Sequence, residues 1–178
     1  MNAESASCVA VSEPTARPAF ATVAEGALNP VYRYLLHLVG DPHQAEDLTS
    51  ATFERALRRW GTFDPARGEP LPWLLAMARS VALDHFRADG RRGRREERYV
   101  AGEPVVGEDR PAGGLSGDLA AALGRLSRSE RELIALRVVL ELDTDEAARV
   151  AGVSASSVSS GLHRALTKLR REVARDEA

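Results

Sequence analysis

The side chains of this 178-residue sequence that could hold a metal or carry out catalysis do not assemble into a site. The four histidines are His37, His43, His85 and His163, and they include no His-Glu-x-x-His pair. Cys8 is the only cysteine, so no cysteine pair exists to bind zinc and no internal disulfide can form. The glycine-rich stretch AGGLSG lacks the lysine and the preceding strand of a phosphate-binding loop. The sequence therefore predicts no catalytic residue, no metal site and no cofactor.

Residues 143–171 carry a different pattern, which suits a helix-turn-helix. This motif needs a small residue where its helices touch, a glycine in the turn and an apolar anchor in the second helix. Ala148, Gly152 and Val158 meet these needs at offsets of four and six. At roughly 100° per residue, the second helix has one apolar face formed by Val158, Leu162, Ala165 and Leu169. The opposite face is wholly polar and comprises Ser156, Ser160, His163, Arg164, Thr167 and Arg171.

The charge of this second helix sets how strongly it could bind DNA. From Ser154 to Arg171 there are four basic residues and no acid, and all four lie in the C-terminal half. Serine releases no counterion from DNA, so the serine-rich front of the helix predicts weak binding to naked DNA. Ser154 is expected to cap the helix, while the other hydroxyls can donate to phosphates or base edges. A helix pair that only packs together would show most of the same pattern. These residues alone therefore support a DNA-binding motif and a plain packed pair equally.

The elements that must position these residues are helices. Asn29-Pro30 is a helix start signal, and the helix that it opens runs through VYRYLLHLV to Gly40. Asp41-Pro42 repeats the signal, and the apolar face of the next helix is formed by Ala45, Leu48, Thr52, Ala56 and Trp60. After the turn-rich loop at 61–70, LPWLLAMARSVALDHFRA predicts a third helix.

Composition divides the chain into two small helical domains joined by a flexible linker. Residues 1–22 mix Ser, Ala and Pro without periodicity and are expected to be disordered. The first domain is expected at 23–98, followed by a linker rich in Gly, Pro and acidic residues at 99–115. The second domain, which contains the helix-turn-helix, is expected at 116–173, with a short tail at 174–178. The predicted fold class is all-α.

Whole-chain properties narrow the setting of the protein. The formal net charge is −2, which predicts no strong attraction of the whole chain to nucleic acid. The sequence has no apolar signal segment near its start and no run of 18 apolar residues, so we expect a cytoplasmic protein without membrane insertion. Within the second domain, Ser127 with Glu130 and Asp143 with Glu146 have the spacing of capping boxes at two helix starts.

Three stretches resemble, in this order, successive segments of bacterial sigma factors. They are GDPHQAEDLTSATFERALRRW, FDPARGEPLPWLLAMARSVALDHFR and LSRSERELIALRVVLELDTDEAARVAGVSASSVSSGLHRALTKLR. The likeness is greatest to the small two-domain type called extracytoplasmic-function (ECF) sigma factors, and it covers residues 25–98 and 116–173. It implies a factor that binds core RNA polymerase, directs it to specific promoters and promotes strand opening. It also implies promoter DNA and an anti-sigma factor as partners.

The resemblance assigns a role to each segment. The core-polymerase helix would contact a basic surface of the polymerase through Glu46, Asp47, Leu48, Ser50, Thr52 and Phe53. The loop at 61–70 would hold a flipped base, and with the next helix it would bind the minus-ten strand through Arg67, Arg79, Ser80, Asp84 and Arg87. The second helix of the helix-turn-helix would contact the minus-thirty-five element through Ser156, Ser157, Ser160, His163, Arg164, Lys168 and Arg171.

The sequence departs from the family pattern at several positions. Relatives usually carry Gln and Glu where Ser50 and Ala51 stand, and basic residues at the positions of Ser159, Gly161 and Leu166. Two alternatives therefore stay open beside the sigma-factor interpretation. One is a stand-alone helix-turn-helix regulator that binds DNA without polymerase. The other is a sigma-like interaction protein that is held by a regulator and cannot start transcription.

Overall fold

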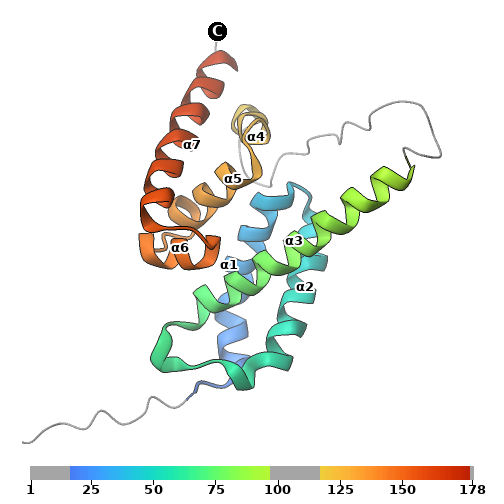
Figure 1. The fold of residues 1–178 in the computed structure, drawn as a ribbon, viewed down its shortest axis with the longest axis vertical. Coiled ribbons are helices and arrows are strands. Elements are labelled where there is room, and N and C mark those ends of the chain that lie inside the picture. The colour runs from blue at the N-terminus through green and yellow to red at the C-terminus, as the bar shows by residue number, and fades with distance from the viewer. Residues whose placement is uncertain (1–16, 97–116, 177–178) are drawn as a thin grey trace, which may run out of the picture.

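The computed structural model describes residues 17–96 and 117–176, and every regular element in these two ranges is helical. The first range forms α1 (Phe20–Val39), α2 (Pro42–Arg59), the 3-10 turns η1 (Trp60–Thr62) and η2 (Pro65–Arg67), and α3 (Pro70–Glu96) (Figure 1). Gly40 ends α1 with a φ of 76°, which favours glycine, and its amide donates to the Leu36 carbonyl. The Asp41 carboxylate then caps α2 by accepting a hydrogen bond from the Gln44 amide at 2.8 Å.

The second range forms α4 (Gly117–Gly124), α5 (Arg128–Ile134), the π-helical turn η3 (Ala135–Val139), α6 (Thr144–Ala151) and α7 (Ala155–Asp176). Both expected capping boxes are present, at the starts of α5 and α6. Gly152 takes a φ of 66° in the turn between α6 and α7, and Val158 behind it is fully buried. The all-α class and the helix-turn-helix pattern are thus confirmed.

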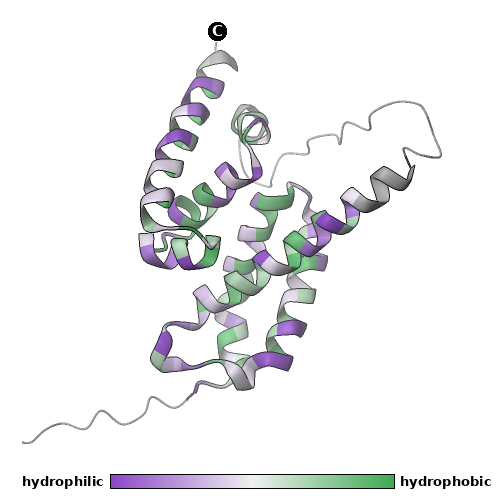
Figure 2. Ribbon diagram, in the orientation of Figure 1, coloured by the Kyte–Doolittle hydropathy of each residue, from purple (hydrophilic) through white to green (hydrophobic). Residues whose placement is uncertain are grey.

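One contiguous apolar core runs through both domains. Within the first domain α1, α2 and α3 pack on one another, while α6 packs against α3, and α5 and η3 pack against α1. The core joins Leu35 and Leu75 of the first domain to Leu136 and Val158 of the second, all four with no exposed surface. Figure 2 shows apolar residues on α1, α3 and α5 around the place where these helices meet. The two domains therefore pack against each other and are not separate bodies.

The expected apolar face of α2 is confirmed, since Ala45, Leu48, Thr52 and Ala56 are buried and Trp60 is half-buried. A smaller apolar cluster lies wholly within the second domain. It is centred on Leu126, Ile134 and Ala165, and it joins α4 and α5 to α7.

The start of α1 differs from the expected one. The helix begins at Phe20, so residues 20–22 are helical and Asn29 does not start a new helix. Tertiary contacts outweigh the local start signal here, because the Phe20 ring meets Trp60 edge-on at 5.3 Å and the Trp60 indole donates to the Pro18 carbonyl at 3.2 Å. Pro30 is accommodated inside the helix at the loss of one backbone hydrogen bond.

The end of α7 also differs, because the helix continues to Asp176 where a tail from 174 was expected. No glycine or proline follows Leu169 to stop it. The predicted tail up to residue 16 with Cys8 and the predicted linker at 99–115 lie outside the described residues. No helix in the described ranges has both the length and the apolar character needed to cross a bilayer.

Candidate nucleic-acid interface

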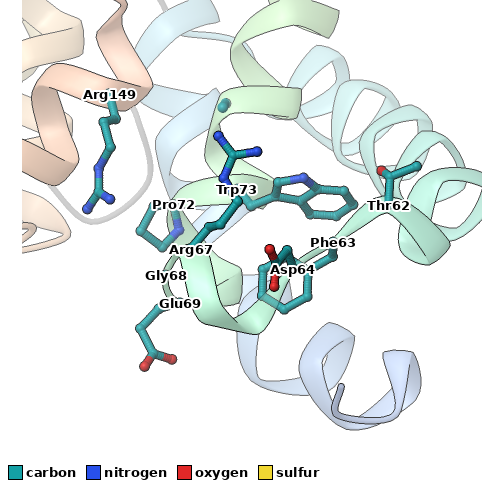
Figure 3. A pocket seen from close by; sticks show the side chains of 10 residues that line it. Thr62, Phe63, Asp64, Arg67, Gly68, Glu69, Pro72, Trp73 and Arg149 are labelled. Atoms are coloured by element: carbon teal, nitrogen blue, oxygen red, sulfur yellow. The ribbon is translucent and has the colours of Figure 1, made fainter. Parts of the chain in front are cut away.

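The loop between α2 and α3 folds into a cavity with aromatic walls (Figure 3). The Asp64 carboxylate caps η2 by accepting a hydrogen bond from the amide two residues on at 3.0 Å, and Gly68 turns the chain with a φ of 140°. Phe63 is buried and stacks on Trp60 with ring centres 4.9 Å apart. Trp73 from α3 packs edge-on against Phe63 at 5.6 Å. The cavity, about 300 Å³, is open to solvent and offers an apolar surface beside polar groups.

Two arginines, one from each domain, line this cavity. Arg67 comes from η2 and Arg149 reaches across from α6 (Figure 3). A guanidinium nitrogen of Arg149 lies 3.7 Å from the place where a Cβ on Gly68 would stand. Within residues 17–96 and 117–176, neither arginine forms an ion pair with a carboxylate. Aromatic walls beside free cations are the combination that holds an unstacked base and its phosphate.

Arg79 of α3 lies in the contact between the two domains. Its Nε donates a hydrogen bond to Glu132 Oε1 of α5 at 2.7 Å, and the Tyr34 hydroxyl of α1 donates to the same oxygen at 2.8 Å. Glu132 is 8% exposed and Tyr34 is fully buried. Burial, together with the neighbouring Glu132 carboxylate, raises the pKa of Tyr34 well above its ordinary value. Tyr34, Arg79 and Glu132 are called the interdomain cluster below.

The remaining residues that were predicted to bind the minus-ten strand lie on an exposed face of α3 and meet an arginine of α2. Arg55 donates to the Ser80 hydroxyl at 3.2 Å and pairs with Asp84 at 3.5 Å. Asp84 also pairs with Arg87 at 3.1 Å, one turn further along α3. Ser80, Asp84 and Arg87 are therefore brought together, with Arg55 as a fourth member that sequence reasoning missed.

The residues expected to contact the polymerase divide into two groups on α2. Three of them are exposed, namely Glu46, Asp47 and Ser50. Leu48 and Thr52 are buried, and the Thr52 hydroxyl donates to the Leu48 carbonyl at 2.7 Å. Phe53 is half-buried against Phe20. The exposed surface of the helix is thus the acidic pair with Ser50, while the other residues hold the helix in place.

The front of α7 presents serine hydroxyls that are already joined to one another. The Ser154 hydroxyl accepts a hydrogen bond from the Ser157 amide at 3.2 Å, which makes it the expected cap. It also lies 3.0 Å from the Ser156 hydroxyl and 2.8 Å from the Ser157 hydroxyl. Further along the helix Ser160, His163, Arg164 and Arg171 are exposed. These side chains lie free for a ligand along one side of α7.

Lys168 lies one turn after Arg164, at the edge of this exposed face, and reaches toward α5. Its Nζ pairs with Glu130 at 3.2 Å, within the second domain. The backbone amide of Ser127, and to a smaller extent Lys168, lower the pKa of Glu130 from its ordinary value. Gly161 is buried as well, because a Cβ there would stand 2.5 Å from Leu133 Cδ1 of α5. Two of the positions where relatives carry basic residues, Gly161 and Leu166, therefore serve packing in this chain.

The comparisons with known proteins fit this geometry. Residues 24–92 match the family model described as sigma-70 region 2, and residues 116–169 match the model described as sigma-70, region 4. The ECF RNA polymerase sigma factor SigC from Mycobacterium tuberculosis is 32% identical over 149 residues, which cover 83% of this chain and 79% of SigC. The chain belongs to the ECF sigma factors.

Two further likenesses support this assignment. The ECF RNA polymerase sigma factor BldN from Streptomyces coelicolor is 36% identical to this sigma factor over 161 residues, which cover 86% of this chain, and the chain spans 60% of BldN. The solved structure of the sigma factor RpoE in complex with the anti-sigma factor NepR from Bartonella quintana shares the fold. It has a TM-score of 0.73 and 24% identity, and the match covers 86% of this chain and 96% of RpoE. ECF sigma factors are transcription-initiation factors, so the prediction that this one is not an enzyme is confirmed.

The fold of this sigma factor brings together residues that the sequence assigned to different DNA elements. Arg79 and Arg164 line the same cavity of about 330 Å³ at the junction of the domains. Sequence reasoning missed Tyr34, Glu132 and Arg149, which lie on the facing surfaces of the domains. Glu132 carried a usable signal, because a charged residue one turn before the buried Leu136 stands on the apolar side of its helix.

Proposed function

We propose that this ECF sigma factor binds core RNA polymerase, directs it to one class of promoters and helps to separate the strands at the minus-ten element. The observation that carries the proposal is the aromatic cavity of the α2–α3 loop, which is lined by the free cation Arg67. The cavity follows the end of α2, and the acidic surface lies near the start of the same helix. Because RNA polymerase works in the cytoplasm, the proposal places this protein there.

The core-binding surface is the exposed face of α2 with Glu46, Asp47 and Ser50. An acidic pair in the first turns of a helix suits a basic surface on the polymerase, and reversing it would bring like charges together at a cost of several kcal/mol. Replacing both acids by lysine should abolish co-elution with core polymerase. The matched control is Glu25→Lys with Glu141→Lys, two exposed acids of which one lies on α1 and the other in the loop before α6. Equal co-elution of the test and control variants would remove the role of α2.

The minus-ten surface is the loop cavity together with the outer side of α3. A base that leaves the stack would lie in the loop cavity that Phe63 and Trp73 line, and Arg67 would meet its phosphate. Ser80, Arg87 and Arg79 would follow the strand along α3, the last of these only once it is released from Glu132. Trp73→Ala should lower the rate of open-complex formation more than the affinity of the holoenzyme for duplex promoter.

The minus-thirty-five surface is the exposed side of α7 with Ser156, Ser157, Ser160, His163, Arg164 and Arg171. Hydroxyl, imidazole and guanidinium groups can donate to base edges in the major groove, and each good contact discriminates by roughly 1–3 kcal/mol. A surface with so few charges suffices when the polymerase carries the helix to the promoter, because tethering raises the local concentration of DNA.

An anti-sigma factor completes the set of proposed partners. The similar sigma factor RpoE was solved in complex with the anti-sigma factor NepR, and the likeness covers both domains of this chain. We expect such a partner to bind this chain in the form in which its two domains lie together.

The experiment that tests the proposal is run-off transcription with purified core polymerase, this chain and a library of promoters. Transcripts that start at a shared sequence pattern support the proposal. Specific DNA binding by the chain without polymerase, with no transcripts from the holoenzyme, would instead support a stand-alone regulator. Core binding without transcripts would support an interaction protein.

A further inference from the structure

The interdomain cluster joins three helices through a single oxygen atom. Glu132 Oε1 of α5 accepts from Arg79 Nε at 2.7 Å and from the Tyr34 hydroxyl at 2.8 Å. The Glu132 carboxylate is almost completely removed from water, so its charge depends on these donors from the first domain. The second domain therefore binds the first through a charge and not through apolar packing alone.

A second charged contact lies on the same side of α5. The guanidinium of Arg128 lies 3.4 Å from the centre of the Phe86 ring of α3, a cation–π contact. Beside these polar contacts, α5 and η3 pack against α1 through residues of the shared apolar core. As a result α5 is joined to α3 at Arg79 and Phe86, while α6 packs on α3 itself.

This closed arrangement cannot engage both promoter elements at once. The minus-ten and minus-thirty-five elements lie about 25 base pairs apart, or about 85 Å of duplex at ~3.4 Å per step. Arg79 and Arg164, one assigned to each element, line one cavity of only about 330 Å³. The domains must therefore separate before both elements are bound, and separation breaks the bonds of Glu132 to Arg79 and Tyr34.

We propose that Glu132 is an internal competitor of promoter DNA for Arg79. In the closed chain the guanidinium pairs with the Glu132 carboxylate, and in the open chain it pairs with a phosphate of the minus-ten strand. Both partners are oxygen anions of the kind that arginine prefers, so the same donor serves each in turn. Tyr34 is a positioning residue, because its hydroxyl fixes the Glu132 oxygen that Arg79 binds. The proposal rests on the minus-ten role of Arg79 described above.

The test compares Glu132→Gln with Glu130→Gln in the free, full-length chain. Both changes remove a carboxylate charge from α5, but Glu130 pairs with Lys168 inside the second domain and serves as the matched control. Fluorophores at Glu54→Cys and Arg170→Cys, both exposed and in different domains, report separation in a Cys8→Ser background. The probe for binding is a labelled single-stranded DNA of mixed sequence.

We expect Glu132→Gln to lengthen the distance between the fluorophores and to raise the affinity for the DNA by about tenfold, because affinity is limited by the fraction of open chain. The control should change neither quantity. In an Arg79→Ala background, Glu132→Gln should give no gain in affinity. Circular dichroism verifies that each variant keeps its helices, and Glu132→Ala serves as a second variant if glutamine retains the bonds of the carboxylate.

Unchanged distance and affinity in both Glu132 variants would overturn the proposal, as would a longer distance without a gain in affinity. Failure of the minus-ten role is seen separately in the holoenzyme. There Arg79→Ala should lower transcription from every promoter while Glu132→Gln leaves it unchanged, since polymerase has already separated the domains. Full transcription with Arg79→Ala would count against the proposed function, whatever the free chain does.

Discussion

The two surfaces assigned to DNA differ in how the folded chain treats them. On α3, Arg79 pairs with a carboxylate of the other domain, and Arg149 of that domain reaches over the loop cavity. On α7, the serines, His163 and Arg164 stay exposed, and none of the described carboxylates pairs with Arg164. Arg79 of the first surface is thus held by the second domain, whereas the side chains of the second surface are open to solvent.

This difference teaches where control of DNA binding can reside. An exposed helix with few cations binds naked DNA weakly at physiological salt, so leaving it open carries little risk of occupation at wrong sites. Cations beside an aromatic cavity favour binding to any single strand, and the pairing of Arg79 with Glu132 weakens that binding. DNA binding by the first domain is thus limited by the fold, whereas DNA binding by the second domain is limited by its own composition.

The largest expected effect is on the free energy of unfolding, which should fall far more for Arg79→Ala than for Arg164→Ala. Arg79→Ala leaves the Glu132 carboxylate buried without its cation, which should cost about 2–3 kcal/mol, somewhat less than for a fully buried pair because Arg79 is 29% exposed. Arg164→Ala should change the free energy of unfolding by less than about 0.5 kcal/mol. Urea denaturation of the whole chain measures both. Equal stability of the two variants would show that the interdomain cluster adds nothing.

The second prediction concerns Tyr34 and alkaline pH. Tyr34→Phe removes a hydrogen bond to a charged group and should cost about 1.5–2 kcal/mol near pH 8. Since the pKa of Tyr34 is raised in the folded chain, its contribution is complete below the ordinary tyrosine value of about 10 and is lost as pH rises above it. The difference between wild type and Tyr34→Phe should therefore shrink as the pH rises above about 10. Tyr32→Phe, on the same helix, is the control for the loss of a tyrosine hydroxyl.

A third, smaller effect sharpens the description of the exposed surface. Arg164→Ala should lower promoter use by the holoenzyme about tenfold, the effect of losing one good contact to DNA. Lys168→Ala should have little effect, because its Nζ pairs with Glu130 and faces α5. Run-off transcription on a library randomised at the minus-thirty-five element measures both. Similar losses in the two variants would mean that Lys168 leaves Glu130 when DNA binds.

The smallest effect tests why this helix carries a glycine. Alanine at position 161 gains about 1 kcal/mol of helix propensity but displaces the Leu133 side chain. Gly161→Ala should therefore be about 1 kcal/mol more favourable in a Leu133→Ala background than in the wild type, as seen in a double-mutant cycle. Gly26→Ala, at a helical glycine with open space around it, should show the full gain. Additive effects at 161 and 133 would argue against the close contact.

Local patterns predicted much of the fold. The capping boxes at Ser127 and Asp143, the glycine turn at 152 and the apolar faces of α2 and α7 follow from residue spacing, and all are present. The start of α1 did not follow, because Phe20 is held by aromatic rings that are distant in sequence. Lys168 is predicted to lie on the DNA surface, and its ion pair with Glu130 of α5 could not be predicted from its charge alone.

The contact between the domains was beyond such patterns. The interdomain cluster is formed by residues that lie dozens of positions apart in the sequence, namely Tyr34, Arg79 and Glu132. No local pattern around one of them predicts its contact with the other two. Only Glu132, a charge on an apolar helix face, indicated that a buried partner was needed.

The shared core has a consequence for the lifetime of the protein in the cell. Separating the domains would bring Leu75, Leu136 and Val158, now without exposed surface, into contact with water. Contiguous apolar patches of this kind promote aggregation and attract proteases and chaperones. A newly made chain is therefore least exposed to aggregation and proteolysis while its domains lie together. The opened form should persist only when a partner covers the apolar surface that opening exposes. Turnover of this factor would then depend on how much polymerase is free to receive it.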